Sequence, residues 1–139
     1  MSRYLTAPLT LRACAAILVA LAVAGCDSAN VIGPGNQLEV NAVVDNFQFQ
    51  VSNLDNVSQD VSYSWENTGT QATVDVSQAI TGGTALLTIT DAAGTVVHQE
   101  DIANNNDTDT AVGVAGNWTI DVELGGATGT INFRVQRKT

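Results

Sequence analysis

From Leu38 onward, the chain contains stretches in which apolar and polar residues alternate, and this two-residue period constrains the fold more than any other feature of the chain. Because successive side chains of a strand point to opposite faces, the alternation predicts β-strands with one buried face. It is clearest over residues 47–52, 61–66, 118–124 and 131–136. Weaker alternation predicts further strands over residues 38–44, 72–76, 84–90, 95–101 and 110–114.

Residues typical of tight turns separate these stretches. Asparagine, aspartate, alanine and glycine gather at 45–46, 53–56, 67–69, 82–83, 92–94, 104–107, 116–117 and 125–126. About eight or nine short strands in one domain predict an all-β fold, a single antiparallel β-sandwich of immunoglobulin-like architecture. We expect its last two strands, 118–124 and 129–135, to form a hairpin.

Large side chains are few and fall on the apolar side of the alternation, so they are predicted to form the core. They are Phe47, Phe49, Tyr63, Trp65, Trp118 and Phe133. Only 5% of the chain is aromatic, which leaves few rings for any other task.

The first 25 residues have the layout of a secretory signal. Arg3 and Arg12 precede an apolar stretch over 13–24, no acidic residue occurs, and small residues follow. As a helix, 13–24 would be about 18 Å long, too short for a hydrocarbon core of about 30 Å. A plain secretory signal with a chance cysteine and a buried helix of the domain are the alternatives.

The order Val23-Ala24-Gly25-Cys26 resembles the lipobox of bacterial lipoproteins. The resemblance implies cleavage between Gly25 and Cys26 and attachment of diacylglycerol to the Cys26 sulfur. Two or more acyl chains hold a protein lastingly to a membrane, here one of the bacterial cell envelope, inner or outer. Cys14 lies in the removed signal, so the mature chain is expected to contain no disulfide.

This interpretation divides the chain into three parts. Residues 1–25 are expected to be a removed lipoprotein signal peptide. Residues 26–37 are expected to be a lipidated N-terminus and flexible tether, since they are rich in Gly, Pro, Asn and small residues. Residues 38–139 are expected to be the β-sandwich domain, held outside the cytoplasm.

The part of the chain after Gly25 is strongly acidic. It contains all 14 acidic residues but only three of the five basic ones, giving a formal charge of −11. Such a surface is repelled by nucleic acid, so nucleic acid is not an expected partner. The expected partners are the membrane, through the lipid on Cys26, and a protein of the envelope.

The sequence contains little that indicates catalysis. His98 is the only histidine and is expected on a surface or edge strand, and no Gly-x-Ser-x-Gly elbow occurs. The adjacent Glu100 and Asp101 would point to opposite faces of a strand, so they could not flank one bond. We therefore expect a noncatalytic domain without a cofactor.

Two kinds of ligand stay open as alternatives. The run Asn104–Asp109 places hard oxygen donors in an expected loop, as calcium prefers, although without the spacing of an EF-hand. A carbohydrate-binding surface would need an aromatic ring, Tyr63 or Trp118, to emerge at an edge or loop.

Three runs carry a further resemblance: Tyr63–Gly69, Ala115–Ile120 and Gly129–Val135. They are similar to runs in small bacterial lipoproteins with a sandwich domain. More loosely, residues 115–135 look like the end of the prepeptidase C-terminal domains that accompany secreted bacterial hydrolases. The resemblance implies a lipid-anchored envelope protein whose sandwich is a protein-interaction or structural module. A carbohydrate-binding module and a calcium-binding accessory domain of a secreted hydrolase system are the alternatives.

Overall fold

The alternating stretches form the strands of an antiparallel β-structure, seen in the computed structural model, which describes residues 30–139. The strands are β1 (Glu39–Val43), β2 (Asn46–Asn67), β3 (Ala72–Thr90), β4 (Val96–Asp101), β5 (Asn106–Asp109) and β6 (Gly116–Arg137). One short 3₁₀ turn, η1 (Pro34–Asn36), precedes them. The prediction of an all-β fold is confirmed.

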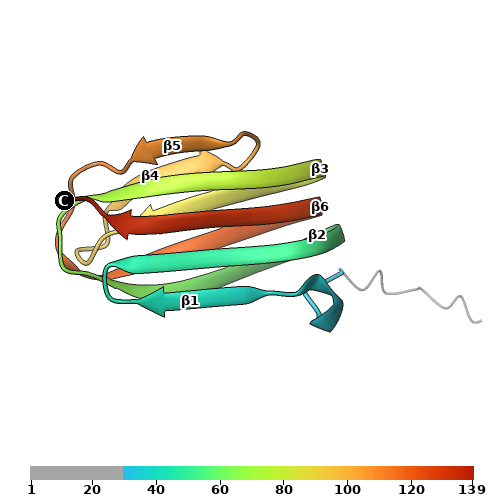
Figure 1. Ribbon diagram of the computed structural model, residues 1–139, viewed down its shortest axis with the longest axis horizontal. Helices are drawn as coiled ribbons and strands as arrows, with labels where there is room; N and C mark the ends of the chain where they lie inside the picture. Colours follow the sequence, from blue (N-terminus) through green and yellow to red (C-terminus); the bar gives the residue numbers. More distant parts are fainter. Residues whose placement is uncertain (1–29) are drawn as a thin grey trace, which may run out of the picture.

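Three long strands run through both layers of the sandwich (Figure 1). In the first layer the strand order is β1, the first half of β2, the second half of β6, the first half of β3, and β5. In the second layer it is the second half of β2, the first half of β6, the second half of β3, and β4. The predicted single antiparallel sandwich, immunoglobulin-like in its two-layered architecture, is present. Its layers are joined by bent strands rather than by loops alone.

The bends lie where the sequence predicted turns. The pairing of β2 with β6 shifts register between Val51 and Gln59, and that of β3 with β6 shifts between Ile80 and Thr84. Such bulges bend a strand and increase its twist without ending it. The expected hairpin of 118–124 with 129–135 is therefore wrong, because both stretches belong to the single strand β6.

Glycines allow the bent strands to lie against one another. Gly83 has a φ of +72°, and a Cβ there would overlap the carbonyl oxygen of Gly126 on the adjacent strand β6. Gly129, with a φ of +126°, lies equally close to the carbonyl of Ala79. Only glycine combines this conformation with so close an approach of two backbones.

One predicted strand is absent and another appears in its place. Residues 110–114 have no regular structure, whereas Asn106–Asp109, expected in a loop, form β5 and pair with the first half of β3. Polar residues are poor strand formers in isolation, but an existing edge supplies hydrogen bonds to any adjacent backbone. The edge of β3 explains why β5 forms despite its sequence.

The core lies between the two layers and contains most of the predicted large side chains. Phe49 and Phe133 stack with ring centroids 5.2 Å apart, and Trp65 and Trp118 meet edge to face at 5.9 Å. Both tryptophans, the three phenylalanines and the surrounding aliphatic side chains are buried. Tyr63 packs against this cluster but is only partly buried.

The segment 30–37 differs from the flexible tether that its composition predicted. Asn30 forms a parallel bridge with Val57, and the main-chain oxygen of Asn30 accepts a hydrogen bond from Ser58 N at 2.9 Å. At the start of η1, Gly33 N donates a hydrogen bond to Asn36 Oδ1. The side-chain amide of Asn36 donates to the carbonyl of Asn53 at 2.8 Å. These contacts dock residues 30–37 on the bend of β2, and residues 26–29 lie outside the described part of the chain.

Candidate functional site

The predicted lipid-attachment site, Cys26, and the predicted cleavage position after Gly25 lie outside the described residues. Asn30 is the first described residue and is already paired with the domain. If Cys26 is acylated, only three residues separate it from Asn30, a reach of about 13 Å at roughly 3.3 Å per residue. Within residues 30–139, no helix is long and apolar enough to cross a membrane.

His98 lies on β4, the edge strand of the second layer, as expected, but its side chain is nearly buried. Its Nε2 lies 3.1 Å from Glu100 Oε1, and the two side chains are only 10% and 15% exposed. Residues two apart on a strand share a face, which brings this pair together. Asn106 on β5 donates from its amide to the other Glu100 oxygen.

This arrangement closes the side of the sandwich between β4 and β5. The two atoms that meet, His98 Nε2 and Glu100 Oε1, are buried and have no other hydrogen-bond partner among the described residues. Asp101 is exposed on the opposite face of β4, as predicted for the adjacent carboxylates. The two carboxylates thus do not share a site.

The side-chain oxygens of Asn105 and Asp109, two of the candidate calcium ligands in Asn104–Asp109, contact different residues. Asn105 Oδ1 accepts from Gln78 N at 2.8 Å, and Asp109 binds Thr73 and Lys138. Because residues 106–109 form a strand, alternate side chains point to opposite faces. Within residues 30–139, no three His, Cys, Asp or Glu side chains lie close enough together to hold a metal ion.

The two aromatic residues considered for stacking on a sugar differ in exposure. Trp118 is fully buried, and its Nε1 donates to the carbonyl of Val114 at 2.7 Å. Tyr63 is partly exposed, and burial raises the pKa of its hydroxyl. Among the described aromatic residues, Tyr63 alone is not fully buried.

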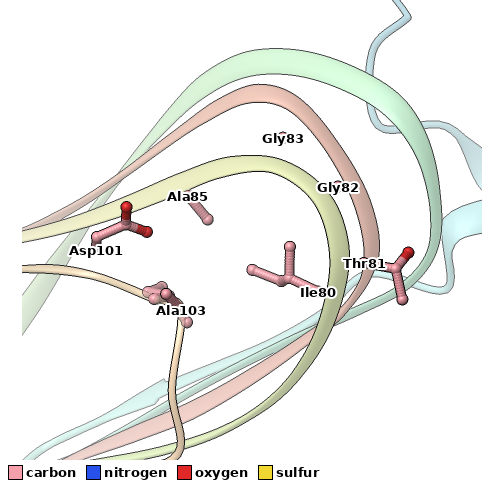
Figure 2. Close-up of a pocket in the computed structure, with 8 residues that line it drawn as sticks. Ile80, Thr81, Gly82, Gly83, Ala85, Asp101 and Ala103 are labelled. Atoms are coloured by element: carbon pink, nitrogen blue, oxygen red, sulfur yellow. The ribbon is translucent and has the colours of Figure 1, made fainter.

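Two shallow hollows lie at the bent end of the sandwich. One, about 270 Å³ in volume, lies on the inner side of the bend of β3, beside the loop that carries Ala103 (Figure 2). The other, about 290 Å³, lies between the N-terminal segment and the bend of β2. Each is lined by a single carboxylate, Asp101 or Asp55, so neither brings together the two carboxyl groups that glycoside hydrolysis usually requires.

Asp91 organises the opposite end of the molecule, and the sequence analysis did not single it out. Its carboxylate accepts hydrogen bonds from the backbone N–H groups of Ala93, Thr95 and Val114, at 3.0, 2.8 and 2.9 Å. The residue is buried. An Asp at the start of the turn Asp91-Ala-Ala-Gly-Thr95 is a recognisable signal, because Asp side chains bond to backbone two residues on. The hydrogen bond from Val114 N holds a loop that is distant in sequence, and no local pattern predicts it.

The hydrogen bonds of Asp91 are expected to make the stability of the domain depend on acid pH. The bonds from the backbone, that of Thr95 above all, hold the pKa of Asp91 below its ordinary value of 3.8. A lowered pKa in the folded state means that the charged carboxylate contributes stability above pH 3.8. This contribution is lost as the pH falls through the folded-state pKa.

Asp91→Asn is therefore expected to lower the Tm clearly at about pH 7 and to differ less from the wild type at about pH 2. Thermal melting across this range measures the difference. Asp55→Asn, at an exposed position of β2 where the side chain forms no hydrogen bond or ion pair with a described residue, is the matched control and should melt like the wild type throughout. A difference in Tm between Asp91→Asn and the wild type that does not change with pH would contradict the assignment.

In comparisons with known proteins, no family model matches the chain, and no curated protein matches it.

Proposed function

We propose that the protein is a lipid-anchored protein of the bacterial cell envelope, with a noncatalytic β-sandwich that acts as a protein-interaction or structural module. The observation that carries the proposal is Val23-Ala24-Gly25-Cys26 at the end of a signal-like segment. Charge, apolar stretch and cysteine agree in position, as secretion followed by acylation requires.

The folded part of the chain supports this proposal in two ways. Asn30, four positions after Cys26, is hydrogen-bonded to the domain, so a lipid at Cys26 would hold the domain close to the membrane surface. Its charged side chains that make close contacts, such as Glu100 on β4 with Asn106 on β5 and Asp45 with Arg137, connect neighbouring strands and loops. They contribute to the structure of the domain, as a binding or structural module requires.

The anchor is tested by the intact mass of the protein isolated from membranes of its native host. The wild type is expected to lack residues 1–25 and to carry the added mass of a diacylglycerol group. Both changes are expected in the wild type alone, so Cys26→Ala should keep residues 1–25 and lack the added mass. A wild-type protein that is freely soluble and carries no lipid would contradict the proposal and indicate a secreted sandwich instead.

A further inference from the structure

Each layer of the sandwich ends in an edge strand on the β1 side. β1 is the edge strand of the first layer, and the second half of β2 is that of the second layer, with no further described strand paired beside it. Val40 of β1 pairs with the buried Phe49 and therefore faces inward, yet its side chain is 37% exposed. On the uncovered part of β2, the inward-facing Val61 and Tyr63 are likewise only partly buried.

The backbone of β2 is open along this side. Glu66 O accepts a hydrogen bond from Asp45 N at 2.9 Å, so the main-chain groups of Glu66 point away from β6. In a regular antiparallel strand the N–H and C=O groups of every second residue point to the same side. The main-chain groups of Asp60, Ser62 and Ser64 therefore also point away from β6. Among residues 30–139, none forms a hydrogen bond with the main chain of these three.

One end of this edge already accepts an extended segment, through a single isolated bridge. Asn30 forms its parallel bridge at Val57, and Ser58 N donates to Asn30 O. The chain then turns away at η1 and leaves the edge uncovered from Asp60 to Ser64. We refer to Asp60–Ser64 as the open edge. It has the geometry that an incoming extended peptide needs, and an unprotected edge is the usual site of strand addition.

The side chains around the open edge indicate the chemistry of the partner. Asp60 lies directly opposite Glu123 on the outer face, and Asp121 lies opposite Ser62. Like charges opposite each other destabilise a sheet, so a basic side chain on an added strand would relieve them. On the inner face, Val61 and Val40 favour small apolar side chains.

A second copy of the chain is a poorer occupant of the open edge. Its own open edge is equally acidic. Pairing of the two open edges would bring Asp60 and Glu66 of one copy close to the same acidic residues of the other, and their like charges would repel. Of the three basic side chains described, Arg137 and Lys138 already form ion pairs with Asp45 and Asp109. The third, Arg134, lies in the first layer, opposite Gln48 and Asp75, and not along the open edge.

We infer that the open edge binds an extended segment of a partner protein in which basic and small apolar residues alternate, by addition as a further strand of the second layer. This inference rests on the proposed function as an interaction module and names the partner's chemistry. The main-chain hydrogen bonds provide the attachment, and the alternating side chains select the partner.

The probe is a synthetic peptide of alternating lysine and valine, about seven residues long, added to the full chain in detergent micelles. Amide hydrogen exchange at Ser62 and Ser64 is expected to slow at least about tenfold on binding. The amides of Val61 and Tyr63 face β6 and serve as internal references. A peptide of alternating glutamate and valine should not bind, and added salt should weaken binding of the lysine peptide.

Ser62→Pro removes an edge N–H that no described residue uses, and prolines are tolerated on edge strands. It should retain the wild-type Tm and bind the lysine peptide at least about tenfold more weakly, whereas Ser62→Ala, which keeps the N–H, should bind like the wild type. Unchanged exchange at Ser62 and Ser64 in the wild type, or equal binding of the glutamate peptide, would overturn the inference whatever the behaviour of the variants. Lipidation of Cys26 is measured separately by mass, so failure of the anchor and failure of the open edge are distinguishable.

Discussion

Replacing Gly83 by alanine is expected to unfold the domain or to lower its free energy of unfolding by more than about 4 kcal/mol. The new Cβ would overlap the backbone of Gly126, and no side-chain rotation can relieve an overlap of two main chains. The φ of +72° adds strain for any residue other than glycine. Chemical and thermal denaturation followed by circular dichroism measures the loss.

Gly94→Ala is the control that separates these two causes. Gly94 has a φ of +84°, but a Cβ there would meet nothing within 4 Å. Its substitution should cost only the backbone strain, about 1–2 kcal/mol. If Gly83→Ala proves no less stable than Gly94→Ala, the close approach of β3 and β6 at the bend is refuted.

Truncating Trp118 to alanine is expected to destabilise the domain by about 3–5 kcal/mol, and Trp65→Ala by a similar amount. Both rings are buried and meet edge to face, so each truncation leaves a large cavity beside the other ring. Each also loses an indole hydrogen bond, from Trp118 to the carbonyl of Val114 and from Trp65 to that of Val43. A folded domain of this size has a total stability of about 5–15 kcal/mol, so either loss is a large share of it.

Val112→Ala is the control for this pair. Val112 lies in the loop before β6 and is 72% exposed, so its truncation should change the Tm little. Melting of Trp118→Ala at the wild-type temperature would refute its place in the core. A double variant that is less destabilised than the sum of the two single variants would show that the rings stabilise each other.

The bends show where reasoning from sequence reaches its limit. Gly125–Gly126 and Gly82–Gly83 are strong turn signals, and in isolation each would end a strand. In the structure β3 and β6 bend side by side and keep their pairing across the register shifts, so the strands continue. Whether a glycine pair ends a strand or bends it depends on what the adjacent strand does, which a single stretch of sequence does not contain.

The same limit explains the other differences. Asn106–Asp109 forms a strand because it can pair with the edge of β3. Residues 110–114 do not form one because they cross the end of the sandwich. There, their backbone N–H groups donate to Val97 O, Thr70 O and the Asp91 carboxylate. The burial of His98 follows from the approach of β4 to β5. The open edge exists because β1 pairs only with the first half of β2, so the second half has a partner strand on one side only.

The sequence by itself determined the all-β class, most of the strand positions and the members of the aromatic core, because these depend on the two-residue period of side-chain direction, which is local. It also carries the prediction of a lipid on Cys26, since an acylation signal is read from consecutive residues. Only the tertiary structure decided that three strands bend through both layers, that residues 30–37 dock on the domain, and that β2 keeps an open edge. Each of these results from contacts between residues far apart in the chain, and a contact of that kind leaves no local periodicity from which it could have been predicted.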